Sequence, residues 1–143
     1  MHSEHVTNLH PGWVLGGWLV SVAIASGAFV ALAGLGFAPD GIAGPALALA
    51  VGFFAGGMFV GFRWSDAPVL HGVAITLFSV LVWFLGLVVA PGALSGSVRR
   101  GDAEVVLGAV LLQLIASVAG GLTGRALVRT GHVPDPASLP PEA

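Results

Sequence analysis

The chain has 143 residues, of which 56% are hydrophobic and 8% are charged, and its formal net charge is −2. A soluble domain needs roughly a quarter of its residues charged, so this composition excludes an ordinary water-soluble domain and favours an integral membrane protein. The absence of Cys excludes disulfides, thiolate metal sites and thiol redox chemistry. No basic patch is present that could hold a nucleic acid.

The chain opens with a polar segment, residues 1–12, that has no Arg or Lys before the first apolar run. That run is too long for the apolar part of a secretory signal, so we interpret it as a membrane span over residues 13–37. The following Pro39 cannot continue a helix, and Asp40-Gly41 favours a turn. A second span is predicted over residues 42–62.

Two further apolar runs follow, and a polar tail ends the chain. The third span is predicted over residues 69–90, before Pro91-Gly92, and the fourth over residues 104–128. The last stretch, 129–143, is rich in Pro and poor in apolar side chains, so we predict that it is disordered. Residues 13–128 are therefore predicted to form one transmembrane domain.

These runs predict helices rather than the strands of a membrane barrel. In the hydrocarbon layer every backbone N–H and C=O needs an internal partner, which leaves helices and closed barrels. Barrel strands have about ten residues of alternating polarity, whereas the runs here are longer and apolar throughout. The predicted fold class is an all-α membrane protein with four transmembrane helices.

Four spans place both ends of the chain on one side of the bilayer. Arg63, Arg125 and Arg129 lie on that side, and Arg99 and Arg100 lie on the other. Because Arg near span ends favours the cytoplasm, we predict cytoplasmic termini in a bacterial inner membrane. The residues predicted to anchor the spans at the membrane interface are Trp13, Arg63, Trp64, Arg125 and Arg129.

The two halves of the chain share short sequence patterns. Val14–Gly17 is similar to Val69–Gly72, and Ala55–Gly57 is identical to Ala119–Gly121. A helical hairpin duplicated in tandem, with both copies in the same orientation, explains these matches. The alternative is that Ala, Gly, Val and Leu are so common here that short matches arise by chance.

Small residues spaced four apart form narrow faces on three of the spans. On the first span this face consists of Ala23, Gly27 and Ala31. Helices in lipid associate through close backbone contact, since lipid tails are as apolar as Leu. We therefore predict that spans one, two and four pack closely, and that span three is peripheral or faces a partner. The predicted helix-packing residues are Gly27, Gly52, Gly56, Gly57, Gly61, Gly120, Gly121 and Gly124.

Two side chains within the spans are candidates for chemistry. His71 could titrate, ligate a metal, or bind a haem or chlorin, or it could simply form an interfacial hydrogen bond. His2, His5 and His10 lie near the same side, but metal ligands need a fixed geometry, so we predict neither a metal site nor a cofactor. Gln113, near the middle of span four, either lines a polar pathway or bonds between helices.

No nucleophile–base–acid set, phosphate loop or pair of membrane carboxylates is present, so we do not expect an enzyme. The first span lacks the Glu of small multidrug exporters, the fluoride-channel motifs are missing, and quinone-linked disulfide enzymes need Cys. The stretch Gly56–Arg63, followed by His71-Gly72, resembles the turn between the second and third spans of uncharacterised small bacterial four-span membrane proteins. That resemblance implies the topology and adds no function.

The leading hypothesis is a non-enzymatic membrane protein that acts by helix packing, as an accessory subunit of a membrane complex or as a homo-oligomer. One alternative is a transporter or channel for a small solute, with Gln113 and the Gly-rich faces of spans two and four lining the path. The other is a cofactor-binding subunit that uses His71.

Overall fold

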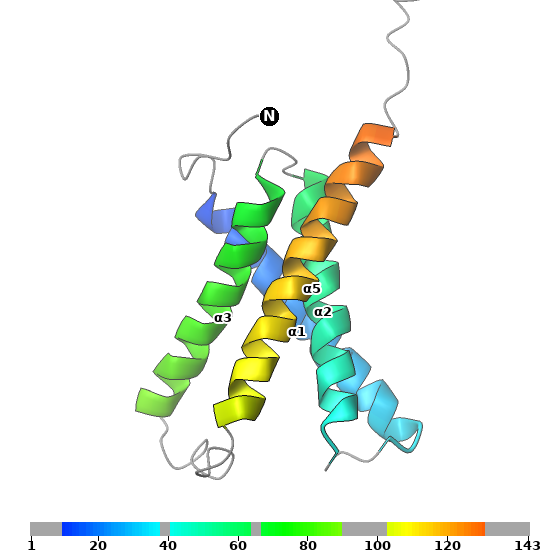
Figure 1. Cartoon of the computed structure of the whole chain (residues 1–143), viewed down its shortest axis with the longest axis vertical. Coiled ribbons are helices and arrows are strands. Elements are labelled where there is room, and N and C mark those ends of the chain that lie inside the picture. Colours follow the sequence, from blue (N-terminus) through cyan, green and yellow to red (C-terminus); the bar gives the residue numbers. More distant parts are fainter. Residues whose placement is uncertain (1–9, 38–40, 64–66, 90–102, 131–143) are drawn as a thin grey trace, which may run out of the picture.

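The computed structural model describes residues 10–37, 41–63, 67–89 and 103–130. Within them the chain forms four helices (Figure 1), whose bounds are α1 Pro11–Gly34, α2 Ala43–Arg63, α3 Pro68–Val89 and α5 Ala103–Thr130. The prediction of an all-α protein with four long apolar helices is confirmed. Of the predicted tail, residues 129 and 130 instead belong to α5, and the rest lies outside the described residues.

Proline sets the start of two helices. Pro11 and Pro68 are the first residues of α1 and α3. Pro suits this position because the first N–H groups of a helix have no partner within it. Both helices therefore begin before the predicted spans, and Pro11 and Gly12 of the predicted polar segment are helical.

α1 ends at Gly34, before the predicted limit at residue 37, because the backbone turns at Gly36. Gly36 has a φ of +87°, a left-handed conformation that glycine adopts at little cost. Its N–H donates to the carbonyl of Ala33 at 3.1 Å, and the N–H of Phe37 donates to that of Leu32 at 3.0 Å. This is a Schellman cap, and hydropathy alone does not reveal it because the residues stay apolar through the turn.

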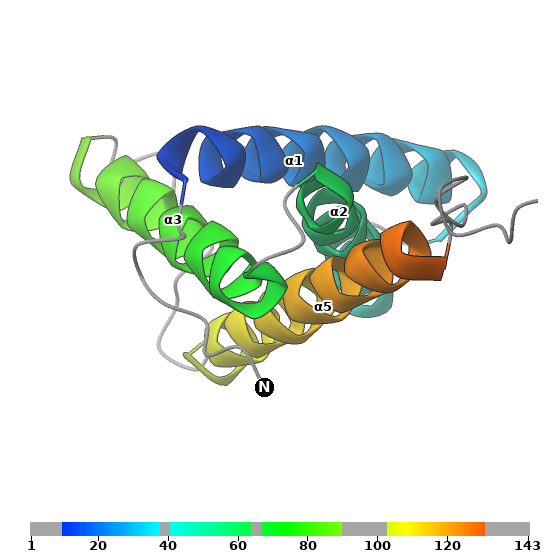
Figure 2. The same cartoon turned by 90° about the horizontal axis from the view of Figure 1, so that it is seen from above.

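α2 lies between α1 and α5 and packs closely against both (Figure 2). α3 packs mainly against α5 and also contacts α1. The buried residues of α1 and α3 lie in their first halves, and those of α5 lie in its second half. These halves meet at one end of the bundle, and α1 and α3 diverge toward the other end (Figure 1).

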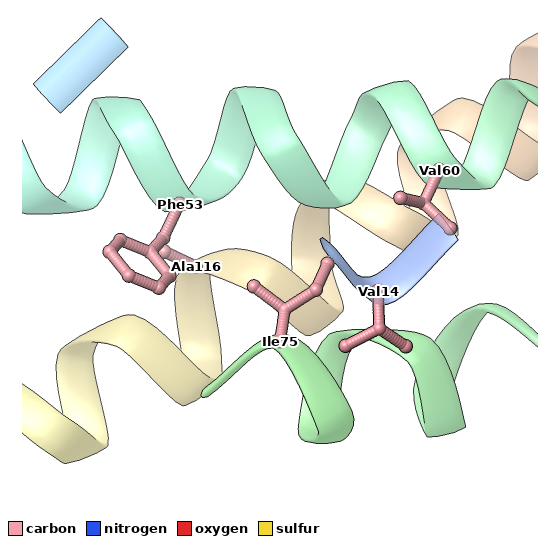
Figure 3. Close-up of a cluster of buried hydrophobic side chains, with 5 residues drawn as sticks. All are labelled: Val14, Phe53, Val60, Ile75 and Ala116. Carbon is pink, nitrogen blue, oxygen red and sulfur yellow. The ribbon is translucent and has the colours of Figure 1, made fainter. Parts of the chain in front are cut away.

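A small apolar cluster joins all four helices at their common contact (Figure 3). Phe53 and Val60 come from α2, Ile75 from α3, Val14 from α1 and Ala116 from α5. Ile75 is completely buried and Val60 is 1% exposed. The core is therefore built at the crossing of the helices rather than along their whole length.

Most large apolar side chains lie on the outside of the bundle. Val30, Leu35 and Val89, for example, are all at least 70% exposed. Water-soluble monomers rarely expose such large continuous apolar surfaces. All four helices are long and apolar enough to cross a bilayer. Their length and hydropathy identify a multi-pass membrane protein, whose apolar outer faces suit contact with lipid.

Candidate functional site

The closest helix contact is made by glycines of α2 against the backbone of α5. A Cβ added at Gly57 would collide with the carbonyl oxygen of Ser117. A Cβ added at Gly61 would collide in the same way with the carbonyl oxygen of Gly121. Both positions are fully occupied by the neighbouring main chain, so no larger residue fits there without moving α5.

Glycines of α5 face the backbone of α2 in return. A Cβ at Gly120 would collide with the carbonyl oxygen of Phe54, and one at Gly124 with that of Met58. The two glycine faces thus touch along their backbones and leave no space between them. No solute path runs between these four glycines in this arrangement of the helices.

The contact between α1 and α2 also depends on glycine. A Cβ at Gly52 would lie 2.5 Å from the carbonyl oxygen of Ser21 and 2.6 Å from the Cβ of Ala25. A Cβ at Gly56 would collide with the Ser21 hydroxyl and the Gly17 carbonyl. Ser21 is completely buried and donates to the Gly17 carbonyl at 2.8 Å, so its hydroxyl is satisfied within α1.

Gly72 is a packing residue that was not predicted from the sequence. A Cβ there would lie 2.9 Å from the backbone Cα of Val118, and Gly121 approaches the carbonyl oxygen of Pro68 just as closely. The first half of α3 is therefore tightly packed, while α3 as a whole is the least buried of the four candidate spans, in line with the prediction that span three is peripheral or faces a partner. A signal was present in the spacing of Gly72 and Thr76, which matches that of Gly17 and Ser21.

Gly27 differs from the other seven predicted packing glycines. It is exposed, and no atom of the described residues lies within 4 Å of the place where its Cβ would be. Ala23 and Ala31, on the same face of α1, are exposed as well. The prediction that Gly27 packs against another helix of this chain is wrong, because α1 turns its Gly17 and Ser21 side toward α2.

Hydroxyl groups hold α3 to α5 near the middle of the bundle. The buried Ser117 hydroxyl lies 2.9 Å from the carbonyl oxygen of Gly72 and 3.1 Å from the Thr76 hydroxyl. Thr76 also lies 3.2 Å from the Gly72 carbonyl oxygen. Each hydroxyl has one proton and several acceptors within reach, so the donors are satisfied without water.

His71 is buried between α1 and α3 rather than placed at the bundle surface. It is 1% exposed, and its Nδ1 lies 2.8 Å from the carbonyl oxygen of Ala67. The backbone N–H of His10 donates to its Nε2 at 3.4 Å. Because a carbonyl only accepts and an N–H only donates, these contacts fit the neutral ring with its proton on Nδ1.

These contacts occupy both nitrogens with which His71 could bind a cofactor. A metal at Nε2 would have to displace the backbone of His10, which caps α1. Among the described residues no three His, Asp or Glu side chains come together as a metal site. His2 and His5 lie outside the described residues.

Gln113 borders a groove between the second half of α3 and the first half of α5. We call this the Gln113 groove; its volume is about 200 Å³, and it is lined by Ser79, Val80, Trp83, Val106, Ala109, Val110 and Gln113. The Oε1 atom of Gln113 is buried and has no hydrogen-bond partner in the part of the chain that the structure describes. The predicted polar residue thus faces a separate groove and not the glycine contact between α2 and α5.

The predicted interface anchors differ in their surroundings. Trp13 packs against Phe59, with ring centroids 6.0 Å apart, so it takes part in helix packing. Arg63 and Arg129 are exposed at the ends of α2 and α5, whereas Arg125 is half-buried and its Nε has no hydrogen-bond partner within the described ranges. Trp64 lies outside the described residues.

Comparison of the chain with protein-family models, with curated proteins and with solved structures finds no match. The resemblance drawn from residues 56–63 and 71–72 therefore supports no family assignment. What the sequence and structure establish together is a helical membrane protein with four candidate spans.

Proposed function

We propose that this protein is a non-enzymatic subunit that acts by helix–helix association, through the exposed face of α1 formed by Ala23, Gly27 and Ala31. The observation that carries the proposal is the difference in burial between the small-residue faces. Those of α2 and α5 are covered by other helices of the chain, whereas the α1 face is exposed and meets no other helix among the described residues. The proposal includes residence in a bacterial inner membrane.

The physical basis is the low energy of close backbone contact in lipid. Without Cβ atoms on one face, two helices approach closely and gain dispersion and weak backbone interactions that lipid tails do not replace. The α1 face has small residues over two turns, and Val30 beside it is 70% exposed. Of the possible partners, a second copy is the one whose matching face is already present.

Substitution of Gly27 tests the proposal. In mild detergent and in lipid nanodiscs we expect the unaltered protein to sediment as a homo-oligomer, and Gly27→Leu to shift it toward monomer by about tenfold or more in dissociation constant, as loss of one close helix contact implies. Ala33→Leu, an exposed small residue on another side of α1, is the matched control and should not dissociate it.

The outcomes separate the forms of the proposal. A protein that is monomeric alone, but is cross-linked through residue 27 to a different membrane protein in its own cells, supports the accessory role and excludes the homo-oligomer. Monomer in detergent, in lipid and in cells, with no effect of Gly27→Leu, contradicts both.

A further inference from the structure

A wide groove separates the first halves of α2 and α5. Both helices begin at the end of the bundle where α1 and α3 diverge (Figure 1), and their backbones touch further along, where Gly57 and Gly61 meet α5. Between the first halves lies a space of about 770 Å³, which we call the α2–α5 groove. Small side chains on both helices leave this space unfilled. Its walls include Pro45, Ala46 and Leu49 of α2 and Glu104, Gly108 and Leu112 of α5.

Glu104 is the one polar side chain among the residues that line this groove. It is exposed, so its carboxylate is open to a ligand, and it is the only acidic residue in the described ranges. The described Arg residues lie at the opposite ends of α2 and α5. Arg125 is 21 positions from Glu104, or about 32 Å along the helix, and salt screens exposed charges that far apart. Among the described residues, the charge beside the groove is therefore negative.

The rest of the wall is apolar and long enough for a hydrocarbon body. Glu104 and Leu112 are eight positions apart, which corresponds to about 12 Å along the helix. An apolar cavity of about 150 Å³ stays dry and holds benzene, so a groove of about 770 Å³ holds a larger hydrocarbon. Apolar contact alone does not select the occupant, because a lipid chain also fits. The carboxylate at the outer end provides the selection.

Charge complementarity distinguishes the possible occupants. A phospholipid has a phosphate between its chains and any amine. A chain that lies in the groove brings this phosphate to the level of Glu104, where the two negative charges repel each other. An uncharged hydrocarbon gains nothing from the carboxylate. An ammonium group attached directly to the hydrocarbon body donates charge-assisted hydrogen bonds to it.

We propose that the α2–α5 groove binds an amphiphilic amine, with its ammonium group on the Glu104 carboxylate and its hydrocarbon body between Leu49 and Leu112. Such an amine stays protonated at neutral pH, as Lys does. The charged end lies where the groove begins, and the apolar end lies deeper between the helices. None of the lining residues belongs to α1, so the site is distinct from the face of Gly27 and does not depend on self-association.

Photolabelling in phosphatidylcholine nanodiscs tests the site. The probe is dodecylamine with a diazirine at the end of its chain, and dodecanol with the same diazirine is the uncharged counterpart. We expect saturable labelling of residues 41–49 and 104–112 by the amine, mapped by mass spectrometry of peptides. Glu104→Gln keeps the size of the side chain and removes its charge. It should raise the half-saturating concentration of the amine about two- to fivefold, the value of a partly exposed ion pair, and leave that of the alcohol unchanged.

Two glycine variants distinguish the groove from general partitioning into lipid. No neighbouring described residue lies within 4 Å of the Cβ position of Gly108 or of Gly12, so a larger side chain at either place should not disturb the fold. Gly108→Leu extends into the groove and should weaken labelling by both probes. Gly12→Leu, on α1, is the matched control and should change neither.

Two outcomes would contradict the proposal. Equal labelling by the amine and the alcohol in the unaltered protein, rising linearly with concentration, would overturn it even if every variant failed to fold. Loss of amine labelling when phosphatidylethanolamine replaces part of the phosphatidylcholine would assign the groove to a bilayer lipid instead.

Discussion

At the scale of single residues, the glycines of this chain divide by what lies beside them. Gly57 lies against the backbone of Ser117, whereas Gly108 of α5 has no described residue within 4 Å of its Cβ position. The same substitution therefore has opposite physical consequences at the two sites. At Gly57 the methyl group of an alanine must displace α5. At Gly108 the change to alanine only replaces a poor helix former with a good one.

Gly57→Ala is expected to lower the free energy of unfolding by about 1–3 kcal/mol, the usual cost of overpacking a rigid contact. Gly108→Ala should leave it unchanged or raise it by up to about 1 kcal/mol, through helix propensity. Unfolding in mixed detergent micelles, followed by circular dichroism, measures both. Equal stability of the two variants would show that α2 and α5 are not in backbone contact.

The sequence located small residues correctly but not the direction in which each face points. Spacing of four identifies a face on an isolated helix, and it did so for Gly52 and Gly56 as well as for Gly27. Which face of α1 meets α2 depends on the fit of Gly17 and Ser21 against Gly56. That fit involves two helices, so no pattern within one span contains it.

At the scale of helix pairs, the same hydrogen bond, from a hydroxyl to the carbonyl of a glycine four residues earlier, recurs in both hairpins. Ser21 bonds to the carbonyl of Gly17, and Thr76 bonds to that of Gly72, one turn earlier in each case. Each pair lies at the contact with the following helix of its hairpin. The arrangement agrees with the predicted tandem duplication, which remains a prediction because similar pairs can arise independently.

The link between Thr76 and Ser117 should be measurable by a double-mutant cycle. Thr76→Val and Ser117→Ala each remove one hydroxyl, and we expect a coupling free energy of about 0.6 kcal/mol, the average for membrane hydrogen bonds, and at most about 1.7 kcal/mol. Thermal unfolding of the four proteins in one detergent gives the cycle. Thr123→Val, which removes a hydroxyl bonded only within α5, is the control and should not couple to Thr76. Additive effects of Thr76 and Ser117 would mean that the hydroxyls do not meet.

The limits of a helix could be predicted where the chemical character of the side chains changes. They could not be predicted where only the backbone conformation changes. Pro68 and the charged Arg63 bracket the turn between α2 and α3, and the predicted spans end within a residue of them. The end of α1 was misplaced because Gly36 changes the backbone within an apolar stretch. The position of Gln113 along α5 followed from the sequence, but the groove beside it did not, since α3 forms its other wall.

At the scale of the whole molecule, the bundle has a packed end and an open end. The packed end contains His71, Gly17 and Gly121, and the open end contains the Gln113 groove and a wider groove of about 770 Å³ between α2 and α5, beside Glu104. The helices pack closely where α1 begins and α5 ends. At the opposite end of the bundle they diverge and leave room for lipid or small molecules. One end of the bundle therefore holds the helices together, and the other end contains the grooves.

The direction in which this bundle crosses the membrane is the last property to test. Exposed Arg63 and Arg129 lie at the packed end, where α1 begins and α5 ends, and Arg near span ends favours the cytoplasm. The chain contains no Cys, so Thr130→Cys and Ala103→Cys place single thiols at the two ends of α5. In intact bacterial cells a membrane-impermeant maleimide should label Ala103→Cys, and it should label Thr130→Cys only after the membrane is opened. The reverse pattern would show the opposite orientation. Labelling of both in intact cells would show that α5 does not cross the bilayer, because the ends of a spanning helix cannot share one side.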